Sequence, residues 1–178
     1  EFGTGDRTNR LTSESSLQLV RAADAARTHR IPLVIVLPSS GAAIDEGVAS
    51  LHCWGLVASS LVACSGIVPT VVIVDGPAVS GPALLLGIVD LVVMTADSDA
   101  FVNGPRLVEE FTGVGIGVDE LGGAASHGRY TGVATAVVAD REAAIATVGD
   151  LLGFLPDHVD QEPPRVECDD PGDRPCPE

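Results

Sequence analysis

Lysine is absent from this sequence of 178 residues, so all ten basic residues are arginines, and they stand against 25 acidic residues. The resulting formal charge of −15 opposes binding to the phosphates of nucleic acids, and we expect no nucleic-acid partner. An anionic small molecule would be attracted only by a local group of arginines. The charge therefore excludes one broad class of function and restricts another.

Aromatic residues make up only 3% of the sequence, so a hydrophobic core must be built from Val, Leu, Ile and Ala. Hydrophobic residues reach 46%, which is enough to form the core of one domain of this length. Asp75, glycine and proline interrupt the longest apolar run before it reaches membrane-spanning length. We expect no membrane partner, and no signal peptide opens the sequence.

The four cysteines form no C-x-x-C pair, so the sequence predicts neither a zinc ribbon nor a redox motif, and we expect no bound metal. Cys53 and Cys64 lie in an apolar helical stretch and are interpreted as core thiols, while Cys168 and Cys176 lie close to the last residue. Reduced cysteines of this kind are typical of the cytoplasm, which is the expected location.

The most informative stretch of the sequence runs from Val71 to Met94. Residues 71–74 read as a buried strand, and Gly76-Pro77 breaks it. Ser80-Gly81-Pro82 then predicts the start of a helix that continues to Asp90, before a second strand over residues 91–94. Such a unit directs the first N–H groups of its helix toward the end of the first strand.

A second turn of small residues follows the apolar strand predicted over residues 31–37. This turn, residues 38–43, is expected to face the turn at Ser80-Gly81, because parallel strands end at the same edge of a sheet. Two N–H groups in such turns can stabilise a negatively charged oxygen. The alternative is a close-packed turn that binds no substrate, and the spacing alone leaves both interpretations open.

Periodicity predicts the other elements along the sequence. Helices are expected over 15–30, 46–65, 106–112, 120–127 and 141–155, strands over 100–102 and 133–139, and a flexible loop over 113–117. In the helix over 46–65, the apolar face is predicted to contain Val48, Leu51, Leu56 and Val62. His52 and Trp54 could line a pocket or serve only in packing.

Composition divides the chain into three parts. Residues 1–14 are polar, residues 15–159 should form the folded domain, and residues 160–178 contain seven acids and five prolines. The last segment lacks any core-forming run, so we expect a linker or tail there.

The block from Gly76 to Asp90 resembles the glycine-rich oxyanion segment of the crotonase superfamily, a G-x-A-x-G-G-G pattern that opens a helix. Within that superfamily the sequence is similar to the N-terminal domain of carboxyltransferase (β) subunits of biotin-dependent acyl-CoA carboxylases. Further matches in order are Ser40-Gly41-Ala42, Glu46-Gly47-Val48, Ser65-Gly66-Ile67-Val68-Pro69, Gly104-Pro105, Glu120-Leu121-Gly122-Gly123-Ala124 with His127, Gly132-Val133-Ala134, Leu155-Pro156 and Glu162-Pro163-Pro164.

This resemblance implies an α/β crotonase-like fold, a superhelix of ββα units, here without the family's first strands. It also implies a backbone oxyanion site. The amide donors would be Gly81 and Ala42, with Ser80 and Gly41 as the neighbouring candidates. The substrate-binding walls would include Val79, Pro82, Phe101, Gly104 and Pro105.

The implied function is the acyl-CoA-binding half of a carboxyltransferase, in which carboxybiotin donates a carboxyl group to the α-carbon of an acyl-CoA through an enolate. Biotin would be carried by a partner, the biotin carboxylase or biotin carrier subunit. A C-terminal carboxyltransferase half would complete the site, in a homo- or hetero-oligomer. Leu84 stands where hydratases of the superfamily have a catalytic glutamate, so hydration is not expected.

Two alternatives remain at this point. A biotin-independent crotonase-type decarboxylase would use the same oxyanion site to stabilise the enolate left by loss of CO2. A non-catalytic assembly subunit is the other alternative, because Ala43 stands where the family usually has arginine.

Overall fold

Four parallel strands form the centre of the protein in the computed structural model, which describes residues 10–165 and residue 174. The strands are β1 (Leu33–Val36), β2 (Thr70–Val74), β4 (Leu91–Thr95) and β6 (Ala136–Val138), in the spatial order β1-β2-β4-β6. All pairings are parallel, as expected of apolar strands covered on both faces. The strands predicted over 31–37, 71–74, 91–94 and 133–139 are therefore confirmed, with shorter ends at the two edges.

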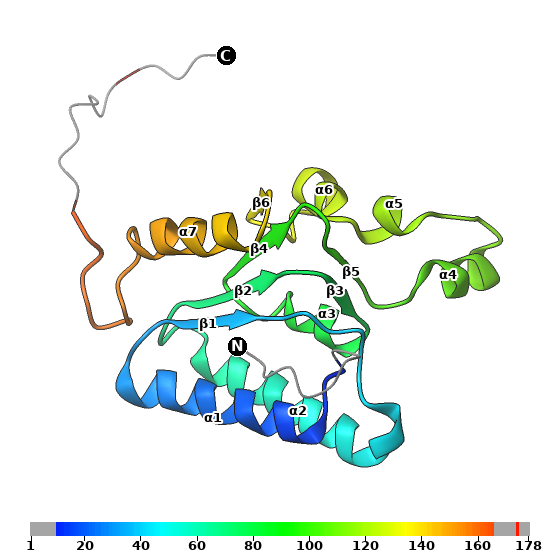
Figure 1. Ribbon diagram of the computed structural model, residues 1–178. Helices are drawn as coiled ribbons and strands as arrows, with labels where there is room; N and C mark the ends of the chain where they lie inside the picture. The colour runs from blue at the N-terminus through cyan, green and yellow to red at the C-terminus, as the bar shows by residue number, and fades with distance from the viewer. Residues whose placement is uncertain (1–9, 166–173, 175–178) are drawn as a thin grey trace.

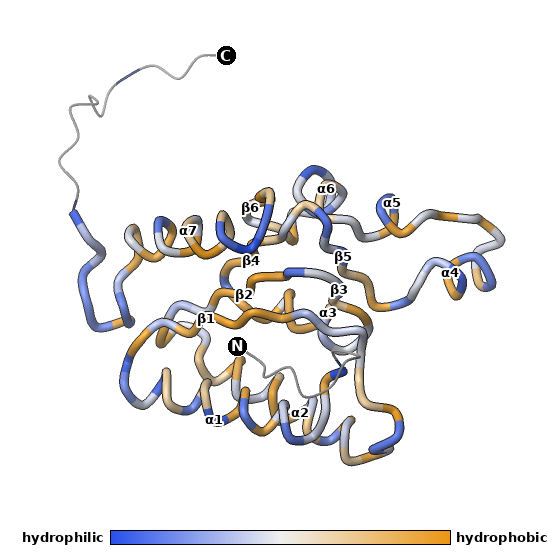
Figure 2. Tube along the Cα trace, in the orientation of Figure 1, coloured by the Kyte–Doolittle hydropathy of each residue, from blue (hydrophilic) through white to orange (hydrophobic). Residues whose placement is uncertain are grey.

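Helices cover both faces of this sheet (Figure 1). Helices α1 (Ser13–His29) and α2 (Val48–Cys64) lie on one face, and α7 (Arg141–Leu152) lies on the other. Every residue of β2 is buried, and its side chains alternate between the faces. Val72 and Val74 pack in the core with α1 and α2, whereas Val71 and Ile73 pack with α7. The orange band of hydrophobic residues in Figure 2 follows these strands.

A smaller sheet stands at the end of the main one and contains β3 (Pro77–Val79) and β5 (Asp99–Phe101) in parallel. Ser39 extends it by a bridge to Ala78. The Gly76-Pro77 pair was predicted only to break the preceding strand, whereas it begins a new one. Proline is tolerated there because it occupies the first position of the strand, while its carbonyl accepts the Ser39 N–H at 2.6 Å.

Helix α3 (Gly81–Leu85) is much shorter than the helix predicted to end at Asp90. The chain turns after Leu85, and the Asp90 carboxylate instead accepts hydrogen bonds from Thr70 N–H (2.8 Å) and Thr70 Oγ1 (2.7 Å). The acidic residue thus fixes the start of β2 rather than the end of a helix.

Helix α2 lies within the range predicted for it, 46–65, but buries the opposite face. The buried residues are Ser50, Cys53, Val57, Leu61 and Cys64. Val48, Leu51 and Val62, predicted to face the core, are 81%, 66% and 58% exposed. A 3-10 turn, η1 (Ile44–Glu46), precedes α2, so Glu46, predicted as the first residue of the helix, belongs to this separate turn.

The segment between β5 and β6 extends to one side of the main sheet (Figure 1). It contains α4 (Pro105–Thr112), α5 (Val118–Gly122), α6 (Ala124–Ser126) and the π-helical turn η2 (His127–Thr131). Helix α4 has no buried residue, and Phe111 is 83% exposed. Residues 113–117 lack regular structure, as predicted.

The ends of the folded body differ from the predicted boundaries. Helix α1 begins at Ser13, and Leu11 before it is 4% exposed, so the last residues of the predicted polar segment belong to the fold. Asp160, in the predicted tail, forms an ion pair with Arg30 at the end of α1. Residues 1–9, most of the segment after 165, and with it Cys168 and Cys176, lie outside the described residues.

Cys53 and Cys64 are buried free thiols, as predicted. Burial raises the pKa of the Cys64 thiol, more than Arg27 lowers it, and its Sγ donates to the Ala23 carbonyl. A protonated thiol of this kind is a packing group rather than a nucleophile.

Candidate functional site

The two predicted turns lie side by side at the carboxyl ends of β1 and β3. Ser39 N–H donates to the Pro77 carbonyl, and Val79 N–H donates to the Ser39 carbonyl at 2.9 Å. A Cβ atom on Gly41 would lie 3.7 Å from the Val79 carbonyl oxygen, so the Gly41-Ala42 turn contacts the segment that leads to Gly81. The structure thus brings together residues that are about 40 positions apart in the sequence.

Two backbone amides in these turns have no acceptor. The Leu11 N–H donates to the Gly41 carbonyl, and the Leu11 carbonyl accepts the Ala43 N–H. The Ala42 N–H, between them, points to the other side of the chain. Within the described residues, neither the Ala42 nor the Gly81 amide donates a hydrogen bond. Unpaired amides near a turn are available to bind an anionic or carbonyl oxygen.

The other two predicted donors are already engaged. The Ser80 N–H donates to the Phe101 carbonyl at 2.9 Å, because the residue after β3 continues the pairing with β5. Ser80 is therefore corrected from a candidate donor to a residue that holds the turn in place. The buried Gly41 amide has only a weak contact, 3.3 Å, to Ser39 Oγ.

Ser80 has an unusual backbone conformation for a serine. Its φ of 63° and ψ of −124° lie in a region that favours glycine, and its side chain makes no cap hydrogen bond to α3. A serine at a helix N-cap normally has extended backbone angles and accepts a hydrogen bond from the first turn. Strain of this type, worth about 1–3 kcal/mol, concentrates at functional sites.

Trp54 of α2 packs directly against Gly81. A Cβ atom on Gly81 would lie 2.9 Å from Trp54 Nε1 and 3.0 Å from its Cδ1, so no side chain fits at this position. The indole Nε1 is buried and has no hydrogen-bond acceptor. The contact with Trp54 thus requires glycine at position 81.

An apolar groove of about 460 Å³ begins beside α3. It lies between α3, β5 and the segment from α4 to η2. Its lining residues are Ala83, Leu84, Leu86, Gly87, Ala100, Phe101, Val102, Asn103, Val108, Leu121, His127 and Val133. Within the described part of the chain, no acidic side chain lines the groove, and Leu84 is one of its lining residues. The groove therefore offers no carboxylate for general acid or base catalysis.

The predicted substrate walls have different places in the structure. Phe101 lines the groove. Gly104 is the N-cap of α4, with Pro105 following, and a Cβ atom on Gly104 would lie 3.7 Å from the Phe101 ring. Val79 is partly buried and its carbonyl faces Gly41. Pro82 is fully buried in the core, so it is corrected from a wall residue to a packing residue.

His127 connects η2 to β5 at the edge of the groove. Its Nε2 lies 2.7 Å from the Ala100 carbonyl and its Nδ1 lies 2.8 Å from Thr131 Oγ1. Since Nε2 must donate to a carbonyl, the ring is oriented by the protein. These contacts agree with a structural role for His127.

Asp99 lies on the same strand as Phe101. Burial, together with the nearby Asp119 carboxylate, raises the pKa of the Asp99 carboxyl.

Two arginines lie on elements that border the groove, Arg106 on α4 and Arg129 on η2. Arg106 pairs with Glu110, and Arg129 lies over the Tyr130 ring.

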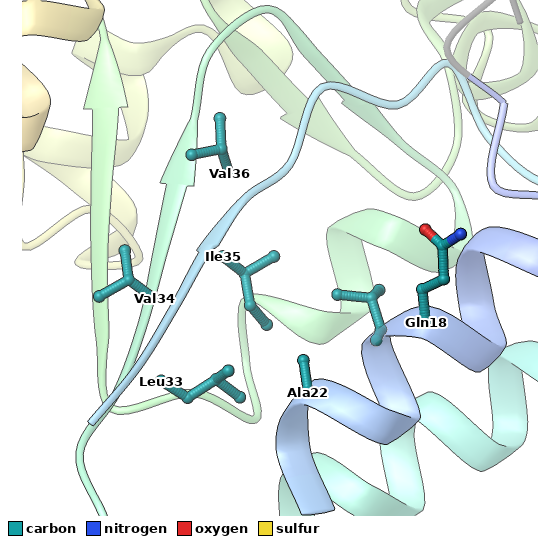
Figure 3. A pocket seen from close by; sticks show the side chains of 7 residues that line it. Gln18, Ala22, Leu33, Val34, Ile35 and Val36 are labelled. Carbon is teal, nitrogen blue, oxygen red and sulfur yellow. The ribbon is translucent and has the colours of Figure 1, made fainter. Parts of the chain in front are cut away.

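A smaller hollow of about 130 Å³ lies between α1 and the edge strand β1 (Figure 3). Gln18 supplies the single polar side chain, and Ala22 with four aliphatic residues of β1 supplies most of the rest. Its lining residues include no titratable side chain. The apolar groove is the better candidate for ligand binding.

Sequence reasoning missed several wall residues of the groove, among them Gly87, Val108 and Leu121. Gly87 lies in the turn that follows α3, so the helical spacing of the predicted helix does not describe its position. Val108 and Leu121 could not be found, because only the path of the chain after β5 brings them to α3. Among the described residues, no group of histidine, cysteine, aspartate and glutamate side chains is arranged to hold a metal ion.

Known proteins resemble this chain in both sequence and structure. The propionyl-CoA carboxylase beta chain of Roseobacter denitrificans is 35% identical over 158 residues, covering 88% of this chain and 31% of that protein. The methylmalonyl-CoA decarboxylase subunit alpha of Veillonella parvula is 31% identical over 164 residues, covering 88% and 32%. The chain therefore spans about a third of the length of these relatives.

A crystal structure of transcarboxylase 12S, a hexamer with methylmalonyl-coenzyme A and methylmalonic acid bound, matches the fold with a TM-score of 0.85. The sequence identity is 31%, and the match covers 88% of this chain and 31% of that chain. No helix in the described part of the protein is long and apolar enough to cross a membrane. The carboxyl transferase domain matches residues 4–178, and the chain belongs to this family, with its crotonase-like α/β fold.

Proposed function

We propose that this chain is the acyl-CoA-binding half of a biotin-dependent acyl-CoA carboxyltransferase. The observation that supports this most directly is the pair of unbonded amides, Ala42 and Gly81, in two turns that contact each other. In the proposed reaction these amides hold the thioester oxygen, where negative charge develops as the enolate forms. Catalysis of this kind uses the main chain and needs no acidic side chain in the groove.

Biotin would be carried by a partner subunit, and bound carboxybiotin would supply the carboxyl group. We assign no residue of this chain to biotin. A C-terminal carboxyltransferase half is the second proposed partner, and α4 offers it an apolar surface through Leu107 and Phe111, 38% and 83% exposed. The coenzyme A phosphates would be attracted by Arg106 and Arg129, on the two elements beside the groove. The unpaired thiols agree with a location in the cytoplasm.

The proposal is tested by comparing propionyl-CoA with its thioether analogue, which lacks the carbonyl oxygen, in calorimetric titrations of the chain. We expect propionyl-CoA to bind about tenfold more tightly, since two hydrogen bonds of about 1 kcal/mol each are lost in the analogue and partly replaced by water. Equal binding of the two, or no binding of either, would contradict the proposed oxyanion site.

A pair of variants isolates the Gly81 amide. In a Trp54→Leu background, which makes room at residue 81, Gly81→Ala keeps the amide and Gly81→Pro removes it. The difference in binding free energy between propionyl-CoA and its thioether analogue should persist in Gly81→Ala and fall by about half in Gly81→Pro. If both variants behave alike, the Gly81 amide is not a donor.

A biotin-independent decarboxylase is the second candidate, and it is favoured by the relative from Veillonella parvula, whose name describes a methylmalonyl-CoA decarboxylase subunit. The same two amides would stabilise the enolate left by loss of CO2. Release of CO2 from methylmalonyl-CoA without biotin, lost in the Gly81→Pro variant, would favour this reaction over carboxyl transfer.

A further inference from the structure

We propose that the groove beside α3 binds the hydrocarbon chain of an acyl-CoA longer than propionyl-CoA, with about six carbons or more. This inference rests on the proposed function and names the class of acyl group that the site accepts. Three features of the groove carry it: its position, its volume and the chemistry of its lining.

The groove begins where the proposed thioester site ends. Ala83 and Leu84, which line it, follow Gly81 by two and three residues on the same helix. Phe101 connects the two places directly, because its carbonyl accepts the Ser80 N–H while its side chain lines the groove. An acyl group whose carbonyl oxygen meets the Gly81 amide can therefore extend along α3 into the groove.

The volume of the groove is large for a short acyl group. A cavity of about 150 Å³ is enough to enclose one benzene molecule, which has six carbons. The groove, at about 460 Å³, is about three times as large. The two carbons that propionyl-CoA has beyond its carbonyl would fill only a small part of this space.

The lining fits a hydrocarbon and offers little to a polar group. Asn103 and His127 are the polar side chains among the lining residues, and the remaining ten residues are apolar. Both ring nitrogens of His127 are occupied by Ala100 and Thr131, so His127 has no free hydrogen bond to offer a ligand. A saturated chain would lose no hydrogen bonds on entering the groove, whereas a charged chain end would be left unpaired.

The test measures the binding of propionyl-CoA and octanoyl-CoA to the full chain by calorimetric titration. Each added methylene should tighten binding about twofold to fourfold, so octanoyl-CoA, with five more methylenes, should bind at least about thirtyfold more tightly than propionyl-CoA. The Gly87→Leu variant fills the groove from an exposed position, where a Cβ atom makes only an ordinary 3.7 Å contact with the Leu84 carbonyl. It should lose the gain for octanoyl-CoA and still bind propionyl-CoA.

The matched control is Gly149→Leu on α7, an exposed glycine with open space around it on the far side of the sheet. This variant should keep the full gain for octanoyl-CoA, and circular dichroism should show that both variants are folded. Equal affinity for the two esters, or a gain that survives in Gly87→Leu, overturns this inference and leaves the proposed function standing.

Two further outcomes are distinct. If no CoA ester binds, the proposed function fails together with this inference. If sedimentation shows a dimer that octanoyl-CoA does not dissociate and that Gly87→Leu disrupts, a second copy of the chain occupies the groove, and the acyl-chain assignment is overturned.

Discussion

Two helices begin from nearly the same backbone conformation, α2 after Gly47 and α3 after Ser80. Gly47 has φ 57° and ψ −132°, and Ser80 has φ 63° and ψ −124°. Glycine adopts these angles without strain, whereas serine does so at a cost of about 1–3 kcal/mol. The same turn is therefore relaxed at one helix and strained at the other.

The surroundings of the two turns explain how the strain persists. A Cβ atom on Gly47 would meet nothing within 4 Å, so that turn stands in open space. The Ser80 turn is held by the Phe101 carbonyl on one side and by Trp54 against Gly81 on the other. The strained turn also presents the unbonded Gly81 amide, so the constrained turn of the pair is the one that carries the proposed chemistry.

The largest effect on stability is expected for Gly81→Ala, because its methyl group would collide with Trp54. The new Cβ atom would lie 2.9 Å from Nε1, so we expect the free energy of unfolding to fall by about 2–3 kcal/mol. Urea denaturation measures this change. In Trp54→Leu the same substitution should cost at least about 1 kcal/mol less, because the contact is gone. An unchanged cost in that background would show that Trp54 does not exclude the side chain.

Gly47→Ala would make the relaxed turn resemble the strained one. Because a Cβ atom there meets no neighbour, its cost is purely conformational, and we expect a loss of about 1–2 kcal/mol in urea denaturation. The control is Gly149→Ala, at a helical glycine with equal space, which should stabilise the protein by up to about 1 kcal/mol. If Gly47→Ala stabilises the protein as much as Gly149→Ala does, the backbone angles shared by Gly47 and Ser80 impose no strain on a side chain.

Ser80→Gly is the reverse change and should relieve the strain at α3. The relieved strain is partly offset because glycine loses more backbone entropy on folding than serine does. We therefore expect the free energy of unfolding to rise by about 0.5–1 kcal/mol. The amide that donates to Phe101 is retained, so propionyl-CoA binding should not weaken. A loss of stability would mean that the exposed Ser80 side chain contributes contacts that offset its strain.

The smallest effect concerns Asp99, on the strand that holds Ser80. Its pKa is raised in the folded protein, chiefly by burial and also by Asp119, so ionisation is more costly in the folded than in the unfolded state. Its contribution to stability therefore falls as the pH rises from its unfolded to its folded pKa. Asp99→Asn should raise the melting temperature at pH 7 and leave it nearly unchanged at pH 3. A lower melting temperature of Asp99→Asn at pH 7 would contradict the raised pKa of Asp99.

Prediction from the sequence succeeded where a pattern had one solution. The run Val71–Val74 is apolar at every position, and only a strand covered on both faces buries all of it, as β2 does. Prediction failed for the inner face of α2, because this helix has apolar residues on all sides. Leu51 and Leu61 are equally hydrophobic, yet Leu51 is 66% exposed and Leu61 is 2% exposed. Periodicity selects a face only when the other face is polar.

The sequence by itself determined the order of the strands in the main sheet and of the glycine turns, and with it the family and the two turns that meet at the site. These features depend on residue types and spacing that act locally, such as glycine at a positive φ and unbroken aliphatic runs. Only the tertiary structure decided which amides remain free. Ser80 and Gly81 are neighbours with the same donor group, but pairing with β5 uses the first, and Trp54 from α2 protects the space beside the second. Hydrogen bonds and contacts between distant segments set that difference, and no local pattern encodes them.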